Sequence, residues 1–99
     1  MPTVPTFSPV LEVSAELVSL RQNGSVEAVY FKWLDDTYVV WIGICNDDSS
    51  ARRAAYRLED SVSEKFPSVL FDFHVVALPE GKKIQDYVSN AQVVFQRGA

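Results

Sequence analysis

Two ionisable side chains, Asp72 and His74, interrupt the otherwise apolar segment from Val69 to Leu78. Residues two apart in a β-strand share a face, so both side chains are expected on the same side of a sheet. An unpaired charge on an apolar strand is costly to bury, so the pair must be partly hydrated or matched by a partner such as Lys32. One interpretation, which we favour, is a satisfied polar patch at a sheet edge or interface. The other is that Asp72 is a metal ligand or general base.

A second acidic group, Asp35-Asp36, lies between two predicted strands. The candidate catalytic residues are therefore Asp36, Asp72 and His74. The candidate metal ligands are Asp35, Asp36 and Asp72, because carboxylates suit Mg²⁺. The single cysteine, Cys45, lies in an apolar run and is expected to be a buried small residue. The sequence holds no phosphate-binding glycine-rich loop, no paired-cysteine metal site and no nucleophile elbow, so it points away from an enzyme.

The charge balance narrows the classes of partner. The 9 Lys and Arg residues against 13 Asp and Glu give a formal net charge of -4, which repels phosphate backbones. Arg52-Arg53 and Lys82-Lys83 are isolated pairs, expected to be hydrated surface. The chain shows neither a signal peptide nor an apolar stretch long enough to span a membrane. We therefore expect a cytoplasmic protein whose partner is neither a nucleic acid nor a membrane.

The elements that would position these residues begin with a helix. Residues 1–7 are expected to form a loose arm, and Ser8-Pro9 has the composition of a helix start. Apolar residues then follow at helical spacing, and Asn23-Gly24 supplies a stop, since glycine tolerates the left-handed conformation that ends helices. The alternative is a strand over residues 11–20 with Asn23-Gly24 as a hairpin turn. We favour the helix because its start and stop signals agree with its period.

Strand patterns dominate the rest of the chain. Residues 26–33 alternate, residues 34–37 form a short turn, and residues 38–45 are apolar on both faces, as in a central strand. A second helix ends at Pro67. A third strand covers residues 69–78, a single helical turn residues 84–89, and an edge strand residues 91–97. We predict one α+β domain over residues 8–97. It is a two-layer mixed sheet with helices packed on it, in the order α-β-β-α-β-(short helix)-β.

This order of elements resembles that of the minimal nucleotidyltransferases. Residues 26–31 resemble the first strand of that family, residues 36–40 the start of the second, and residues 93–97 its hydrophobic and basic ending. Asp72 falls where the carboxylate of the third strand belongs. The resemblance implies a site in which carboxylates hold Mg²⁺ against a nucleoside triphosphate.

The sequence departs from that family at two motifs. Residues 31–34 run straight into Asp35, where the family has a Gly-Ser motif. Tyr38 replaces the second acid of the Asp-x-Asp motif, and a tyrosine hydroxyl is a poor Mg²⁺ ligand at neutral pH. The resemblance therefore implies a shortened, catalytically silent relative, with no cofactor unless Mg²⁺ is still bound.

Three functions are consistent with these observations. The first is a non-catalytic module that binds itself or another protein, because the sheet is unusually aromatic; Trp33, Tyr38 and Phe95 are the candidate interface residues. The alternative is a metal-dependent nucleotidyl or phosphoryl transferase that uses Asp36 and Asp72. The third is a small-ligand pocket lined by Trp33, Tyr38 and His74.

Overall fold

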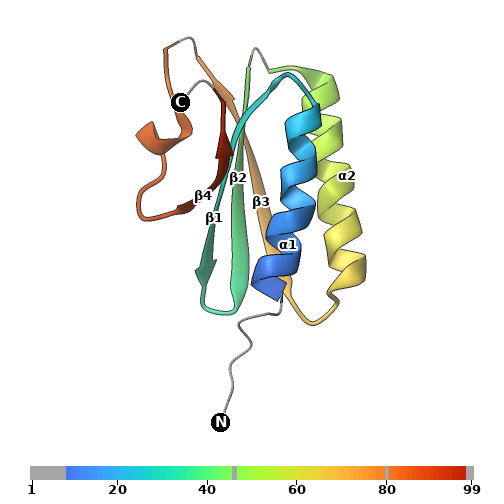
Figure 1. The fold of residues 1–99 in the computed structure, drawn as a ribbon. Helices are drawn as coiled ribbons and strands as arrows, with labels where there is room; N and C mark the ends of the chain where they lie inside the picture. Colours follow the sequence, from blue (N-terminus) through green and yellow to red (C-terminus); the bar gives the residue numbers. More distant parts are fainter. Residues whose placement is uncertain (1–8, 46, 80, 98–99) are drawn as a thin grey trace.

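The computed structural model describes residues 9–45, 47–79 and 81–97, which form two helices against a four-stranded sheet (Figure 1). The predicted α+β class and order of elements are confirmed. The expected arm over residues 1–7 and the proposed cap Ser8 lie outside the described residues. The elements are α1 (Pro9–Val18), the 3-10 turn η1 (Ser19–Gln22), β1 (Val26–Leu34), β2 (Thr37–Cys45), α2 (Ser49–Lys65), β3 (Leu70–Leu78), the 3-10 turn η2 (Ile84–Asp86) and β4 (Gln92–Gln96).

The strand order in the sheet is β3-β2-β1-β4. β1 runs antiparallel to both β2 and β4, whereas β2 and β3 are parallel. Parallel neighbours need a crossover connection, and α2 provides it. The expectations of a central apolar second strand and of a last strand at the edge are both confirmed.

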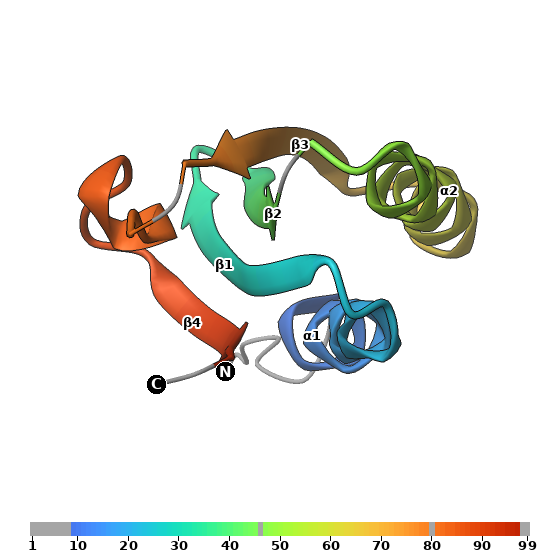
Figure 2. The ribbon, with the colours of Figure 1, turned by 90° about the horizontal axis from the view of Figure 1, so that it is seen from above.

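Both helices cover one face of the sheet (Figure 2). Their apolar sides pack on the inward side chains of the strands in one large core. Its helical members are Val13, Leu17, Leu20, Ala51, Ala55, Leu58 and Val62. The helical spacing at the start of the chain thus reports a buried helix face, and the strand alternative for residues 11–20 is wrong. None of the helices within the described ranges is long and apolar enough to cross a membrane.

The first helix stops where predicted, but by a different mechanism. Asn23 ends η1 with an extended backbone (φ -88°), and Gly24 does not adopt a positive φ. Instead the Asn23 side-chain oxygen accepts a hydrogen bond from the Ser25 N–H at 3.0 Å, which forms a local turn. At the second helix, the Asp48 carboxylate accepts from the Ser50 N–H at 2.8 Å and caps α2.

The segment around η2 covers part of the opposite sheet face (Figure 2). Ile84 is fully buried there against Ala28 and Tyr30 of β1. Gly43 of β2 lies beneath this cluster, where a Cβ would be 2.7 Å from Leu78 Cδ1, so that the Leu78 side chain would have to shift, and in ordinary contact with Ile84 Cδ1 at 3.5 Å. The covered area is therefore the half of the face nearest the carboxyl ends of β2 and β3.

Ile84→Ala tests how strongly η2 is held on the sheet. Removing a fully buried isoleucine side chain leaves a cavity, so we expect the free energy of unfolding to fall by about 3 kcal/mol. Tyr87→Ala is the control, since Tyr87 is exposed in the same segment and should change stability by less than about 0.5 kcal/mol. Urea unfolding followed by circular dichroism measures both. Equal, small effects would mean that η2 does not pack on the sheet.

Candidate functional site

The two edges of the sheet differ sharply. β3 pairs with β2 over all nine of its residues without interruption. On its other side it pairs with no strand of the described ranges. β4 is only five residues long, begins and ends with glutamine, and has an irregular register against β1. Short, irregular and polar strands resist further pairing, whereas a long and regular apolar edge invites it. The open edge of β3 is therefore the edge of this domain that is more prone to pair with another strand.

Asp72 and His74 lie together on β3, on the face turned away from the helices. Asp72 Oδ2 is 3.1 Å from His74 Nε2, and the two side chains are 55% and 49% exposed. The imidazole also stacks on Trp41 of β2, with ring centroids 6.0 Å apart. The pair is a hydrated polar patch at a sheet edge, so neither residue has to be charged in a dry environment.

The expected match between Lys32 and this pair is not made. Lys32 and Asp72 both neighbour Val39, one from β1 and the other from β3, so the whole of β2 separates them. Lys32 takes part in none of the ion pairs formed by residues whose placement is described. The polar partner of Asp72 is therefore His74, on its own strand.

The Asp35-Asp36 pair forms the two-residue turn between β1 and β2. Both residues have positive φ, 49° and 66°, and the flanking Leu34 and Thr37 are paired. This combination is a tight hairpin turn, which aspartate tolerates better than most side chains do. Within the described ranges, no three His, Cys, Asp or Glu side chains are grouped so that they could hold a metal ion. Asp35 and Asp36 thus do not form such a group with Asp72.

Cys45 is remote from the only histidine. Its neighbour on β3 is Leu78, four residues beyond His74. The thiol lies 3.4 Å from a Glu27 carboxylate oxygen, and burial, together with this carboxylate, raises the pKa of Cys45. A raised pKa keeps the sulfur protonated, which suits a packing role and not a nucleophile.

Two of the three candidate interface residues are core residues. Tyr38 is fully buried on the helix side, where its hydroxyl lies 3.1 Å from Ser14 Oγ and its ring stacks on Phe31. Phe95 is also buried, with the guanidinium carbons of Arg21 and Arg97 at 6.0 and 5.9 Å from its ring centroid. The strand positions of both residues point them at the helices, so both pack in the core of the domain.

Trp33 is the one candidate interface aromatic that is exposed, at 43%. Its ring packs edge-on against Tyr38, with centroids 5.9 Å apart, on the helix side of the sheet. His74 lies on the other face, beside Trp41. The predicted ligand pocket of Trp33, Tyr38 and His74 is therefore not formed.

Glu59 of α2, which the sequence analysis did not single out, lies near the β3 edge. Burial raises the pKa of Glu59, and a hydrogen bond from the Phe73 backbone N–H acts in the opposite direction. The charges of Asp60 and Asp72 raise the pKa further, while His74 lowers it. Glu59 therefore lies near the Phe73 backbone N–H at the edge of the sheet.

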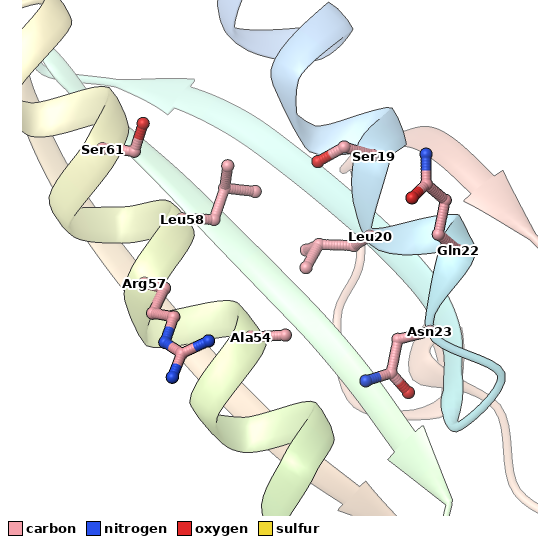
Figure 3. A pocket seen from close by; sticks show the side chains of 8 residues that line it. All are labelled: Ser19, Leu20, Gln22, Asn23, Ala54, Arg57, Leu58 and Ser61. Carbon is pink, nitrogen blue, oxygen red and sulfur yellow. The ribbon is translucent and has the colours of Figure 1, made fainter.

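A groove of about 510 Å³ lies between η1 and α2 (Figure 3). Leu20, Ala54 and Leu58 form its apolar floor, and Arg57 is its one cation. The amide of Asn23 at the rim is occupied, since it donates to Ser50 Oγ at 3.3 Å and accepts from Ser25. The polar rim thus joins the two helices and serves the fold.

No protein-family model, no curated protein and no solved structure matches this chain. The site has to be interpreted from its own geometry. That geometry offers a long open strand edge that carries one acid and one histidine, with a third ionisable group directed at its backbone.

Asp36→Gly separates a turn role from a metal role for this aspartate. Glycine adopts a positive φ without the strain of a side chain, so we expect the free energy of unfolding to rise by about 0.5 kcal/mol. The melting temperature of parent and variant should respond equally to millimolar Mg²⁺ with ATP. A ligand-dependent stabilisation of the parent that disappears in the variant would instead support the transferase hypothesis.

Proposed function

We propose that this domain is a non-catalytic self-association module, in which the β3 edges of two copies pair antiparallel into one continuous sheet. The observation that carries the proposal is the nine-residue unpaired edge with Asp72 and His74, both exposed, near its middle. Backbone groups on such an edge lack strand partners, and a second edge supplies them.

The direction of the Phe73 N–H selects the pairing register. Alternate residues of a strand turn their N–H and C=O groups to the same side, so Phe71, Phe73 and Val75 present theirs on the open edge. A twofold axis at Phe73 pairs this residue with Phe73 of the second copy. Phe71 then lies opposite Val75 of the second copy, so that apolar side chains meet on the helix side.

In this register Asp72 lies directly opposite His74 of the second copy, and the symmetry repeats the pair. Such a directly opposed pair flanks the hydrogen-bonded ones and has a Cα separation of about 4.5 Å, which brings the side chains close. An interface between identical copies must be self-complementary, so that residue i meets residue j twice. An acid and a histidine two positions apart on an edge strand meet this requirement. A register shifted by two residues would place Asp72 opposite either Val76 or Asp72 of the second copy, and neither forms an acid–histidine pair.

A relationship to the nucleotidyltransferases remains part of this proposal, supported by the order of elements alone. The residue at the place of the second family carboxylate, Tyr38, is buried and hydrogen-bonded to Ser14. Such a relative would keep the scaffold and lack the groups that hold a metal ion.

Charge reversal across the edge tests the register. Asp72→Lys places a lysine opposite His74 of the second copy, and His74→Glu places a glutamate opposite Asp72, so each change should weaken association about tenfold. The double variant Asp72→Lys/His74→Glu restores opposite charges and should recover most of the loss. Sedimentation equilibrium over micromolar to millimolar concentrations gives the Kd.

Glu12→Lys is the matched control for these variants, because it makes the same charge change at an exposed position of α1. Its Kd should equal that of the parent. The proposed edge is wrong if the parent stays monomeric throughout the concentration range. The proposed register is wrong if the double variant associates no better than the single ones.

Glu59→Ala tests whether Glu59 of α2 weakens pairing at the β3 edge. The change leaves the Phe73 N–H of both copies available for pairing, so we expect association to become about 25 times tighter, the value of two hydrogen bonds. Asp60→Ala removes a neighbouring charge without freeing that N–H and should have less effect. If the two variants tighten association equally, charge alone acts and the backbone contact does not matter.

A further inference from the structure

Asp72 and His74 present two donor atoms of the kinds that transition-metal ions bind, a carboxylate oxygen and an imidazole nitrogen. Asp72 Oδ2 and His74 Nε2 are 3.1 Å apart. Two ligand atoms of a tetrahedral Zn²⁺ ion, each bonded at about 2.0–2.2 Å, lie roughly 3.3 Å from each other. The two side chains of β3 are therefore already spaced like neighbouring ligands of one metal ion.

The imidazole ring of His74 is oriented by the adjacent strand. Trp41 of β2 is the register partner of His74, and the two rings stack with an interplanar angle of 19°. This stacking on one side and the contact with Asp72 on the other restrict rotation of the ring. Both ionisable side chains nevertheless stay about half exposed, at 55% and 49%. The two donor atoms are thus preorganised and still accessible from solution.

One copy of the chain supplies only half of a metal site. Structural Zn²⁺ sites have four protein ligands, and catalytic sites have three. In the part of the chain that the structure describes, no group of three His, Cys, Asp or Glu side chains could hold a metal ion. Asp72 and His74 of a single copy therefore leave at least one ligand to be found elsewhere.

The edge pairing proposed above, on which this inference rests, supplies the other half. Its twofold axis passes between the two Phe73 residues, and Asp72 and His74 flank Phe73 on one face of the strand. Directly opposed residues there have a Cα separation of about 4.5 Å. Two carboxylates and two imidazoles therefore surround the axis, on the sheet face turned away from the helices.

The charges around this axis favour a cation. The two Asp72 carboxylates bring two negative charges, and none of the ion pairs between residues of the described ranges joins Asp72 to a lysine or an arginine. Glu59 adds another acid nearby, because the charges of Asp60 and Asp72 both act on it. A divalent cation on the axis would neutralise the Asp72 pair without adding a further side chain.

We infer that the paired β3 edges bind one Zn²⁺ ion on the twofold axis, held by Asp72 and His74 of both copies. Two nitrogen and two oxygen ligands suit Zn²⁺, whereas Mg²⁺ and Ca²⁺ take oxygen ligands. Histidine ligates in its neutral form, so the ring proton lies on Nδ1 when Nε2 binds the metal. Because the complete site exists only in the pair, the ion stabilises the pair over the single copy.

Sedimentation equilibrium at about pH 8, where imidazole is free to ligate, tests the site. The Kd of association is compared in EDTA, in about 0.1 mM Zn²⁺ and in the same concentration of Mg²⁺. Zn²⁺ should lower the Kd at least about tenfold, and Mg²⁺ should leave it within about twofold. Calorimetric titration should give one Zn²⁺ per two chains. His74→Gln and Asp72→Asn each remove two of the four ligands and should abolish the response to Zn²⁺.

Two control variants remove other donors of the same kinds. Asp36→Asn removes a turn carboxylate at a positive φ that asparagine tolerates, and Cys45→Ser removes the only thiol of the chain. Both should keep the full response to Zn²⁺. A response that persists in His74→Gln, or that disappears in Cys45→Ser, would overturn the assignment of the ligands. Binding of one Zn²⁺ per chain would overturn the shared site.

The measurement in EDTA separates this site from the pairing itself. A parent protein that associates in EDTA and is not tightened by Zn²⁺ overturns the metal site and leaves the proposed pairing intact. A parent that stays monomeric both in EDTA and with Zn²⁺ overturns the two together.

Discussion

The apolar strand β2 has to be buried on both of its faces, and the remaining elements are arranged around that requirement. Tyr38, Val40, Ile42 and Ile44 point into the core under the two helices. Trp41 and Gly43 point to the other face, under the η2 segment. β1 reaches one side of β2 through a two-residue turn, while α2 carries the chain back so that β3 lies parallel on the other side. With both neighbours of β2 supplied in this way, β3 becomes an edge.

Pairing at the β3 edge, as proposed, needs a means of selecting one register and one partner. A uniformly apolar edge would pair in several registers and with many partners. In the proposed pairing, one acid and one histidine on the same face favour registers in which Asp72 of one copy meets His74 of the other. In the same proposal, Glu59 of α2, near the Phe73 N–H, opposes pairing, because an incoming strand would have to displace its carboxylate. In this proposal, the side chains of Asp72 and His74 set the register of pairing, and Glu59 sets its affinity.

Much of this fold could be predicted from the sequence, and the site much less. Helical spacing in residues 10–20, alternation in residues 26–33 and the stop at Pro67 are local signals that tertiary packing reinforces. The face that a given aromatic residue occupies depends on strand register, which is set by partners distant in sequence. For this reason Tyr38 and Phe95 could be recognised as sheet residues, but their burial under the helices could not be foreseen. Lys32 was likewise expected to match the Asp72–His74 pair, yet β2 intervenes between Lys32 and Asp72.

The same reasoning explains why a cavity beside η2 could not be predicted from the sequence. Its lining residues come from β1, from the connection after β3 and from the end of β4, and they share one cavity because β4 returns to pair with β1. The burial of Ile84 holds the turn that carries Lys82 and Lys83 over the end of the sheet. Beyond the area that η2 covers, Leu70 remains 64% exposed at the start of β3. On this face, the η2 segment therefore covers the end of the sheet near Ile84 and leaves the start of β3 exposed.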